Sequence, residues 1–136
     1  MNRVVITGMG IYSCIGKNLE EVKKSLYEGK SGIIFDEKRV SFGYRSCLTG
    51  MVDKPDLKKY LSRRQRVSLG EEGSYAYLAT REALKNAQIK EKFFDQNDVG
   101  IIYGNDSTAK STIESVDKIR EKKTLLWLDQ GLFLKQ

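Results

Sequence analysis

Apolar residues follow two spacings along the chain, and these spacings predict its secondary structure. The segment Arg3–Gly8 holds an uninterrupted run of β-branched apolar residues that ends at a glycine, as in a strand covered on both faces. The segment Asp98–Gly104 repeats the pattern and predicts a second buried strand. Helical spacing follows each run, so the order of elements is that of an α/β protein. No internal repeat, low-complexity segment or linker divides the chain.

Three helices of nine residues or more are predicted. The first begins after Asn18, whose side chain can cap it, with Glu21 at the capping-box spacing and Gly29 as its stop. The second covers about Ser68–Gln88, where small and apolar residues alternate at helical spacing and indicate a buried element. The third is capped by Ser107 or Thr108 and runs to about Lys122.

The region between the first two predicted helices is less regular. Ile33–Phe35 is a short apolar piece, and residues 42–52 alternate enough for an irregular hairpin or an extended loop. Pro55 fits the first turn of a short helix over Asp56–Leu61.

Glycines at positions 8, 10 and 16 follow the first predicted strand and precede a helix, which is where a dinucleotide-binding fold places its phosphate loop. The spacing does not fit that fold, because five residues separate Gly10 from Gly16 and the fingerprint has two. The alternative is that the glycines let the chain leave the strand at positive φ and pack closely, without a ligand. The residues alone favour packing.

The amino-acid composition excludes several kinds of catalytic and metal site. The 136 residues hold 24 Lys and Arg against 18 Asp and Glu, and a net charge of +6 favours acidic partners such as nucleic acid, anionic lipid or an acidic carrier protein. There is no histidine, which excludes a Ser-His-Asp triad, a Cys-His pair and a His-based metal site. Two cysteines cannot form a closed zinc site, so we expect no metal and reduced thiols. No apolar run of about 20 residues and no leader are seen, which predicts a cytoplasmic protein without a membrane segment.

Two stretches carry a resemblance to a known family. Residues 4–18 read V-V-I-T-G-M-G-I-Y-S-C-I-G-K-N and residues 25–33 read S-L-Y-E-G-K-S-G-I, and both resemble the opening of the 3-oxoacyl-[acyl-carrier-protein] synthases. The resemblance extends to about Lys123, and Arg45-Ser46 is more similar to the type I synthases than to type II. It implies the amino-terminal part of a thiolase-like α/β fold.

The resemblance implies a function for the family and none for this chain alone. Members are dimeric enzymes that load an acyl group onto a cysteine and condense it with malonyl groups on acyl carrier protein in fatty acid synthesis, without a cofactor. Their nucleophile and two histidines lie beyond the last residue here, so no catalytic residue is assigned. Neither Cys14 nor Cys47 stands in the nucleophile motif. The chain is expected to be an inactive fragment or, alternatively, a non-catalytic module that binds acyl carrier protein or a nucleotide.

The resemblance also places an acyl-carrier-protein-binding site at Arg63, Arg64 and Arg66, where charge-assisted bonds can form to acidic groups. The third arginine lies one position from the family pattern. Two other interpretations stay open for the cluster: a solvated group of charges at a helix end, or contacts to nucleic acid phosphates with Tyr60 stacking on a base. No nucleic-acid-binding fold surrounds it, so nucleic acid is not the predicted partner.

Residues 124–136 depart from the family pattern. Suitable codons, read one base out of frame from Lys123, yield a sequence like the family's continuation, so we predict a partial synthase domain over 1–123 and a frameshifted tail over 124–136. The tail is apolar, and the early strands would lack their usual neighbours, which predicts a poorly stable and aggregation-prone product.

Overall fold

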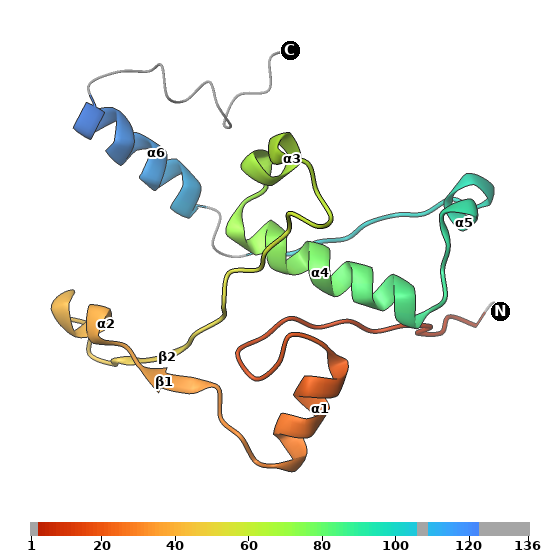
Figure 1. Cartoon of the computed structure of the whole chain (residues 1–136), viewed down its shortest axis with the longest axis horizontal. Coiled ribbons are helices and arrows are strands. Elements are labelled where there is room, and N and C mark those ends of the chain that lie inside the picture. The colour runs from red at the N-terminus through yellow and green to blue at the C-terminus, as the bar shows by residue number, and fades with distance from the viewer. Residues whose placement is uncertain (1–2, 106–108, 123–136) are drawn as a thin grey trace. The chain divides into compact units, whose positions relative to one another are not determined.

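The computed structural model describes residues 3–105 and 109–122, and within these ranges the chain forms six α-helices and two short strands (Figure 1). The chain divides into two units. Unit 1 comprises Met1–Lys54 and Tyr75–Asp98, and unit 2 comprises Pro55–Ser74 and Val99–Gln136. In chain order the elements are α1 (Leu19–Tyr27), β1 (Ile33–Phe35), α2 (Glu37–Ser41), β2 (Leu48–Gly50), α3 (Arg63–Ser68), α4 (Glu71–Asn86), α5 (Glu91–Gln96) and α6 (Ala109–Lys122).

Helix α1 begins and ends where its sequence predicts. The side-chain oxygen of Asn18 accepts a hydrogen bond from the backbone N–H of Glu21 at 2.9 Å. The Glu21 carboxylate in turn accepts from the N–H of Lys17 at 2.8 Å, one residue before the partner that a capping box uses. Gly29 follows the helix with φ +63°, and the N–H of Lys30 reaches back to the carbonyl of Ser25. This arrangement is a Schellman stop.

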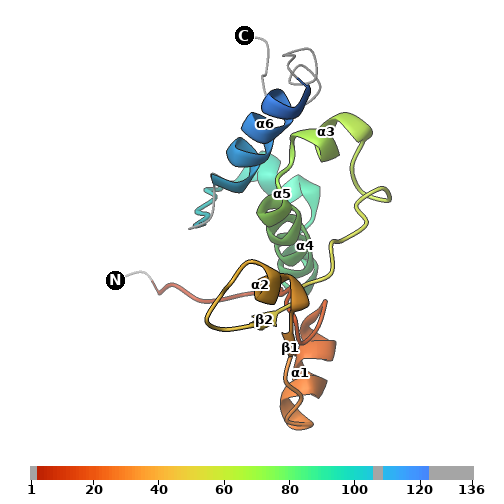
Figure 2. The same cartoon turned by 90° about the vertical axis from the view of Figure 1, so that its left-hand side faces the viewer.

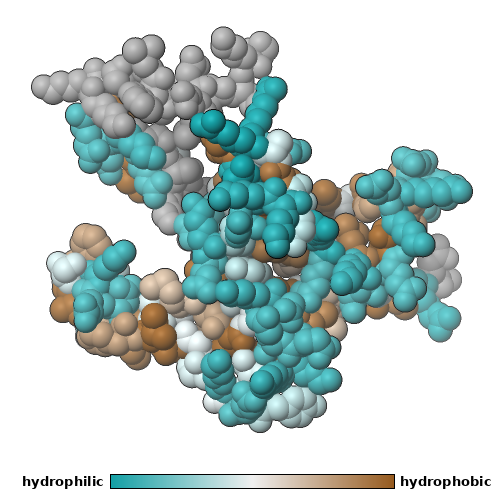
Figure 3. Space-filling model, viewed as in Figure 1, coloured by the Kyte–Doolittle hydropathy of each residue, from teal (hydrophilic) through white to brown (hydrophobic). Residues whose placement is uncertain are grey.

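The irregular region after α1 is a β-hairpin with a helix in its connection. Strands β1 and β2 pair antiparallel, with Ile34 opposite Thr49. Helix α2 lies between them and was not predicted, although Asp36 caps it by accepting from the N–H of Lys38 at 3.0 Å. Figure 3 shows apolar residues over this hairpin, and the side chains of β1 are exposed.

Helix α4 confirms the long predicted helix but not its predicted burial, since among its residues only Ser74 is buried. It supports the glycine loop of unit 1. In Figures 1 and 2 the loop lies between α4 and α1. A Cβ added at Gly8 would lie 2.7 Å from the Cβ of Ala87, and one at Gly10 would lie 2.7 Å from the backbone nitrogen of Ala83. Close packing of these glycines is therefore confirmed. A positive φ is not, since among the described residues only Gly29, Gly43 and Gln88 have one.

The two predicted buried strands are absent from the described residues. The segment 3–8 and the segment 98–104 contain no assigned strand, and the side chains of Val4 and Ile6 are 96% and 86% exposed. A strand of this composition needs paired neighbours on its edges and cover on its faces. The described residues provide neither a paired strand nor cover for the segment 3–8, so the prediction that this segment is a buried strand was wrong.

Unit 2 contains α3, α6 and the first part of α4. Among the described residues of unit 2, the buried apolar side chain is that of Leu57, whose carbonyl accepts from the N–H groups of Tyr60 and Leu61. This is a single turn and not the short helix predicted over Asp56–Leu61, while helix α5 in unit 1 was not predicted at all. Helix α6 ends at Lys122 as predicted, but its predicted caps, Ser107 and Thr108, and the tail 124–136 lie outside the described residues.

Candidate functional site

The basic cluster lies on α3, a short helix held by its own cap. Ser62 Oγ accepts a hydrogen bond from the N–H of Gln65, and Gln65 Oε1 accepts from the N–H of Ser62 at 2.9 Å, which completes a capping box. The first turn holds no acidic residue. Positive side chains at this end oppose the helix dipole, so the cap offsets an unfavourable placement of charge.

The three predicted arginines do not share one environment. The side chains of Arg63 and Arg64 are exposed, and no ion pair within the described ranges involves either of them. Arg66 is half-buried, and its Nε donates to the carbonyl of Leu61 at 3.2 Å. Two arginines therefore point their charge at solvent, whereas the third is partly used to hold the turn that precedes the helix. Exposed Lys58 and Lys59 lie in that turn and extend the positive charge.

The glycine loop contains carboxylates where a phosphate-binding loop would hold its phosphate. Glu82 Oε1 accepts from the N–H of Leu19 at 2.8 Å, and Glu82 Oε2 accepts from the N–H of Ile11 at 2.9 Å. Glu21 takes the N–H of Lys17 in addition. Because negative side chains already satisfy these donors, a phosphate would meet charge repulsion at the start of α1. The geometry supports the packing interpretation of the glycines.

A second set of contacts fixes the loop to the segment after β2. Lys17 Nζ lies 2.8 Å from Asp53 Oδ2, and the Tyr12 hydroxyl donates to the Asp53 carbonyl at 3.1 Å. The Tyr12 ring also stacks on that of Tyr75 at 5.6 Å. The hydrogen bond from Lys17 holds the pKa of Asp53 below its ordinary value, and the same bond raises the pKa of Lys17. Sequence reasoning missed these contacts and Glu82, because the partners are far apart in the chain and no local motif marks them.

The two cysteines are not brought together as a site. Both thiols are free, and both residues are half-buried. Cys14 lies against Gly32, where an added Cβ would come within 2.7 Å of its sulfur, and Cys47 lies 3.8 Å from the Tyr44 carbonyl. Among the described residues no cluster of metal-ligating side chains occurs, and no helix is long and apolar enough to cross a membrane.

The geometry does not identify a protein family, so the chain was compared with known proteins. A sequence model of the family described as "Beta-ketoacyl synthase, N-terminal domain" matches residues 1–130. A 3-oxoacyl-[acyl-carrier-protein] synthase 1 of Buchnera aphidicola is 40% identical over 128 residues, which are 92% of this chain and 31% of the relative. A synthase of the same name from Escherichia coli is 38% identical over 106 residues, 77% of this chain and 26% of the relative.

A solved structure gives the same match at the level of the fold. The crystal structure of a beta-ketoacyl synthase from Burkholderia phymatum superposes with a TM-score of 0.76 at 23% sequence identity. The match covers 93% of this chain and 31% of that one. This chain thus has the α/β fold of about one third of a larger protein, and it spans about a third of the length of the relatives that it matches.

Proposed function

The chain belongs to the beta-ketoacyl synthase family, and on that premise we propose that it is the amino-terminal part of a 3-oxoacyl-[acyl-carrier-protein] synthase that docks acyl carrier protein. In the parent reaction an acyl group is condensed with a malonyl group carried on that protein. The observation that carries the proposal is the exposed pair Arg63 and Arg64 on a capped helix, in a chain whose relatives are named for acyl carrier protein.

The charge of the cluster supports docking of an acidic partner. Arg63 and Arg64 have no carboxylate partner in the described ranges, so binding would not require breaking an internal ion pair. Exposed positive groups attract an acidic protein over about 10 Å at moderate salt, and guanidinium groups can bind carboxylate or phosphate in a bidentate way. Arg66 contributes less in this proposal, because its Nε is engaged by Leu61.

We propose that these 136 residues carry out no condensation by themselves. The absence of histidine from the sequence supports this, because the resemblance implies a reaction in which two histidines stabilise developing negative charge. Cys14 lies against Gly32 and Cys47 against the backbone carbonyl of Tyr44, and the sequence contains no histidine that could activate either thiol. The resemblance also supports a cytoplasmic homodimer for the longer protein.

We also propose that residues 124–136 are the product of a frameshift after a partial synthase domain over 1–123. The change of pattern after Lys122-Lys123, whose codons are rich in adenine, supports this origin. Sequencing of the DNA across these two codons tests it: an adenine run followed by a family-like frame is expected, and its absence would rule out the frameshift.

A titration of isotope-labelled acyl carrier protein with this chain, followed by NMR, tests docking. We expect shifts near the carrier's acidic residues that weaken as salt is raised, since the contacts are electrostatic. Arg63→Glu and Arg64→Glu should each weaken binding about tenfold or more, as expected for loss of a charge-assisted contact of roughly 1.5 kcal/mol.

Two controls separate docking from unfolding and from general charge. Lys92→Glu makes the same change of charge at an exposed position on α5 and should leave the affinity nearly unchanged. Arg63→Glu places a negative charge in the first turn of α3, which should stabilise that helix slightly while binding is lost. Equal loss from Lys92→Glu, or no binding by the unaltered chain, would refute the docking proposal.

A further inference from the structure

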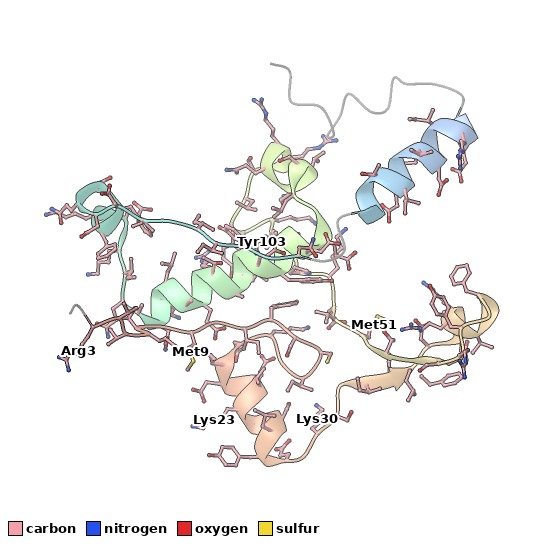
Figure 4. All side chains as sticks on the ribbon, turned by 180° about the vertical axis from the view of Figure 1, so that it is seen from behind. Arg3, Met9, Lys23, Lys30, Met51 and Tyr103 are labelled. Atoms are coloured by element: carbon pink, nitrogen blue, oxygen red, sulfur yellow. The ribbon has the colours of Figure 1, made fainter. Side chains whose placement is uncertain are left out.

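The β1–β2 hairpin of unit 1 carries a group of exposed apolar side chains. Figure 4 shows the hairpin extending away from the labelled Lys30 and Met51, which lie where the chain enters and leaves it. Phe35 lies opposite Leu48 in the antiparallel pair, and Ile33 lies on the same face. Helix α2 and the residues after it add further apolar groups. We call the following six residues the hairpin surface, and each is 50–77% exposed: Ile33, Phe35, Val40, Phe42, Tyr44 and Leu48.

Contacts at both ends of the hairpin fix the hairpin surface. Near the first end, a Cβ added at Gly50 would lie 3.2 Å from the sulfur of Cys14, so the strands pack on the glycine loop. At the other end, Arg39 Nη1 donates to the carbonyl of Leu48 at 3.3 Å, and the Arg39 guanidinium group lies 4.7 Å from the centre of the Tyr44 ring. A surface that is fixed in this way loses little conformational entropy when a partner covers it.

The area of the hairpin surface is large enough for a stable protein interface. Side chains of this size cover about 150–200 Å² each when they are fully buried, so the six leave on the order of 600 Å² of apolar area exposed. A stable interface takes about 800 Å² from each partner, of which roughly 60% is apolar. The hairpin surface can therefore supply the apolar part of such an interface.

The charges around the hairpin surface favour a second copy of this chain as the partner. Residues 36–45 hold two acidic and three basic side chains, so their net charge is close to zero. Of these, Glu37, Lys38 and Arg45 are exposed, and no ion pair within the described residues involves any of the three. A strongly acidic partner or an anionic lipid surface would meet like charge at Glu37. An interface between two identical surfaces needs self-complementary charge, which both signs on one surface provide.

We propose that two copies of this chain associate through their hairpin surfaces about a twofold axis. Each copy covers the apolar side chains of the other, and the negative Glu37 side chain lies among positive side chains of the second copy. A twofold contact is closed, so association stops at the dimer. The contact also stabilises the hairpin, because two strands alone are marginally stable in water. The proposal does not depend on docking by Arg63 and Arg64, which belong to unit 2.

Analytical ultracentrifugation of the full chain over a concentration series tests the proposal, and we expect an equilibrium between monomer and dimer. In a mixture of isotope-labelled and unlabelled chains, NMR contacts between copies should join the Phe42 ring of one copy to the hairpin surface of the other. A chain that stays monomeric would overturn the proposal, even if it binds phosphatidylglycerol vesicles through this surface. Open-ended aggregates without a dimer, or contacts between copies at other residues only, would also overturn it.

One variant and a matched control sharpen the result. Phe42→Asp places a charge at the most exposed residue of the hairpin surface and should raise the dimer Kd at least tenfold. Ile6→Asp makes a similar change at an exposed residue of unit 1 outside the hairpin and should change Kd less than twofold. Exchange of the Asp36 amide, which donates to the Cys47 carbonyl at 2.8 Å, reports whether the hairpin is formed in each variant. An unchanged Kd in Phe42→Asp, or an equal rise in Ile6→Asp, would count against the proposal.

Discussion

Glu82 on α4 holds the first residue of α1, since its Oε1 accepts a hydrogen bond from the backbone N–H of Leu19 at 2.8 Å. The other oxygen of the same carboxylate accepts from the N–H of Ile11 at 2.9 Å. One side chain thus ties the glycine loop and the start of α1 to α4. Its negative charge at the amino terminus of α1 is also favourable to the helix dipole.

Replacement of Glu82 should release the loop. Glu82→Ala removes both acceptor oxygens and leaves two partly buried N–H groups without a partner. Each lost hydrogen bond to the charged carboxylate contributes about 1.5 kcal/mol or more to stability. We expect exchange of the Ile11 and Leu19 amides to accelerate about tenfold or more, as measured by NMR. Glu82→Gln, which keeps a single side-chain oxygen, should lie between. Unchanged exchange in Glu82→Ala, or equal acceleration by Glu91→Ala on α5, would contradict this role.

Gly10 and Gly100 form a matched pair for the packing interpretation of the glycine loop. A methyl group at Gly10 would approach the backbone of Ala79 and Ala83 too closely, whereas one at Gly100 would meet no atom within 4 Å. Gly10→Ala should therefore lower the free energy of unfolding by about 1–3 kcal/mol, and Gly100→Ala should change it by about 0.5 kcal/mol or less. Urea denaturation followed by circular dichroism compares the two. Similar values for both would remove close packing as the reason for Gly10.

The ion pair of Lys17 and Asp53 should set two limits of pH. Because the pKa of Asp53 is lowered, this carboxyl group contributes to the free energy of unfolding above pH 3.8, its ordinary pKa. The contribution is lost as the pH falls through the pKa of the folded state. Because the pKa of Lys17 is raised, this ammonium group contributes to the free energy of unfolding below pH 10.5, its ordinary pKa, and the contribution is lost as the pH rises through the pKa of the folded state. Between about pH 5 and 9 the contribution should be constant. It should be small, because both side chains are exposed and salt screens the pair.

An NMR titration of the Asp53 carboxyl group checks the lower limit. Its midpoint should lie below 3.8 in the unaltered chain and move upward in Lys17→Met, while Lys24→Met on α1 leaves it unchanged. A midpoint that does not respond to Lys17→Met would mean that the pair is not formed in solution.

Elements with local signals could be predicted from the sequence. Helix α1 carries its cap at Asn18 and its stop at Gly29, and α4 is long enough for its spacing to be clear. Helix α2 has only five residues, yet Asp36 before it and Gly43 after it are residue types typical of a helix cap and a helix stop, and in the structure they mark its ends. Short helices bury few residues and give little periodicity from which to predict them.

Features that depend on distant residues could not be predicted. Glu82 accepts hydrogen bonds from Leu19 and Ile11, which precede it in the chain by 63 and 71 positions, and no local motif marks this role. The segment 3–8 has the composition of a buried strand, but a strand forms only where neighbours pair with it, and composition does not reveal whether they are present. In the candidate site, Arg63 and Arg64 were identified through the resemblance, whereas the bond of Arg66 to Leu61 emerged only from the structure.

Turnover by the isolated chain tests the central claim most directly. The purified chain is incubated with acyl and malonyl forms of acyl carrier protein, with the Escherichia coli synthase 1 as a positive control, and the products are followed by mass spectrometry. The account predicts no 3-oxoacyl product and no decarboxylation above the buffer rate, together with salt-sensitive binding of the carrier protein. Product formation that is lost in Cys14→Ser or Cys47→Ser would contradict it, because it would place the reaction within these 136 residues.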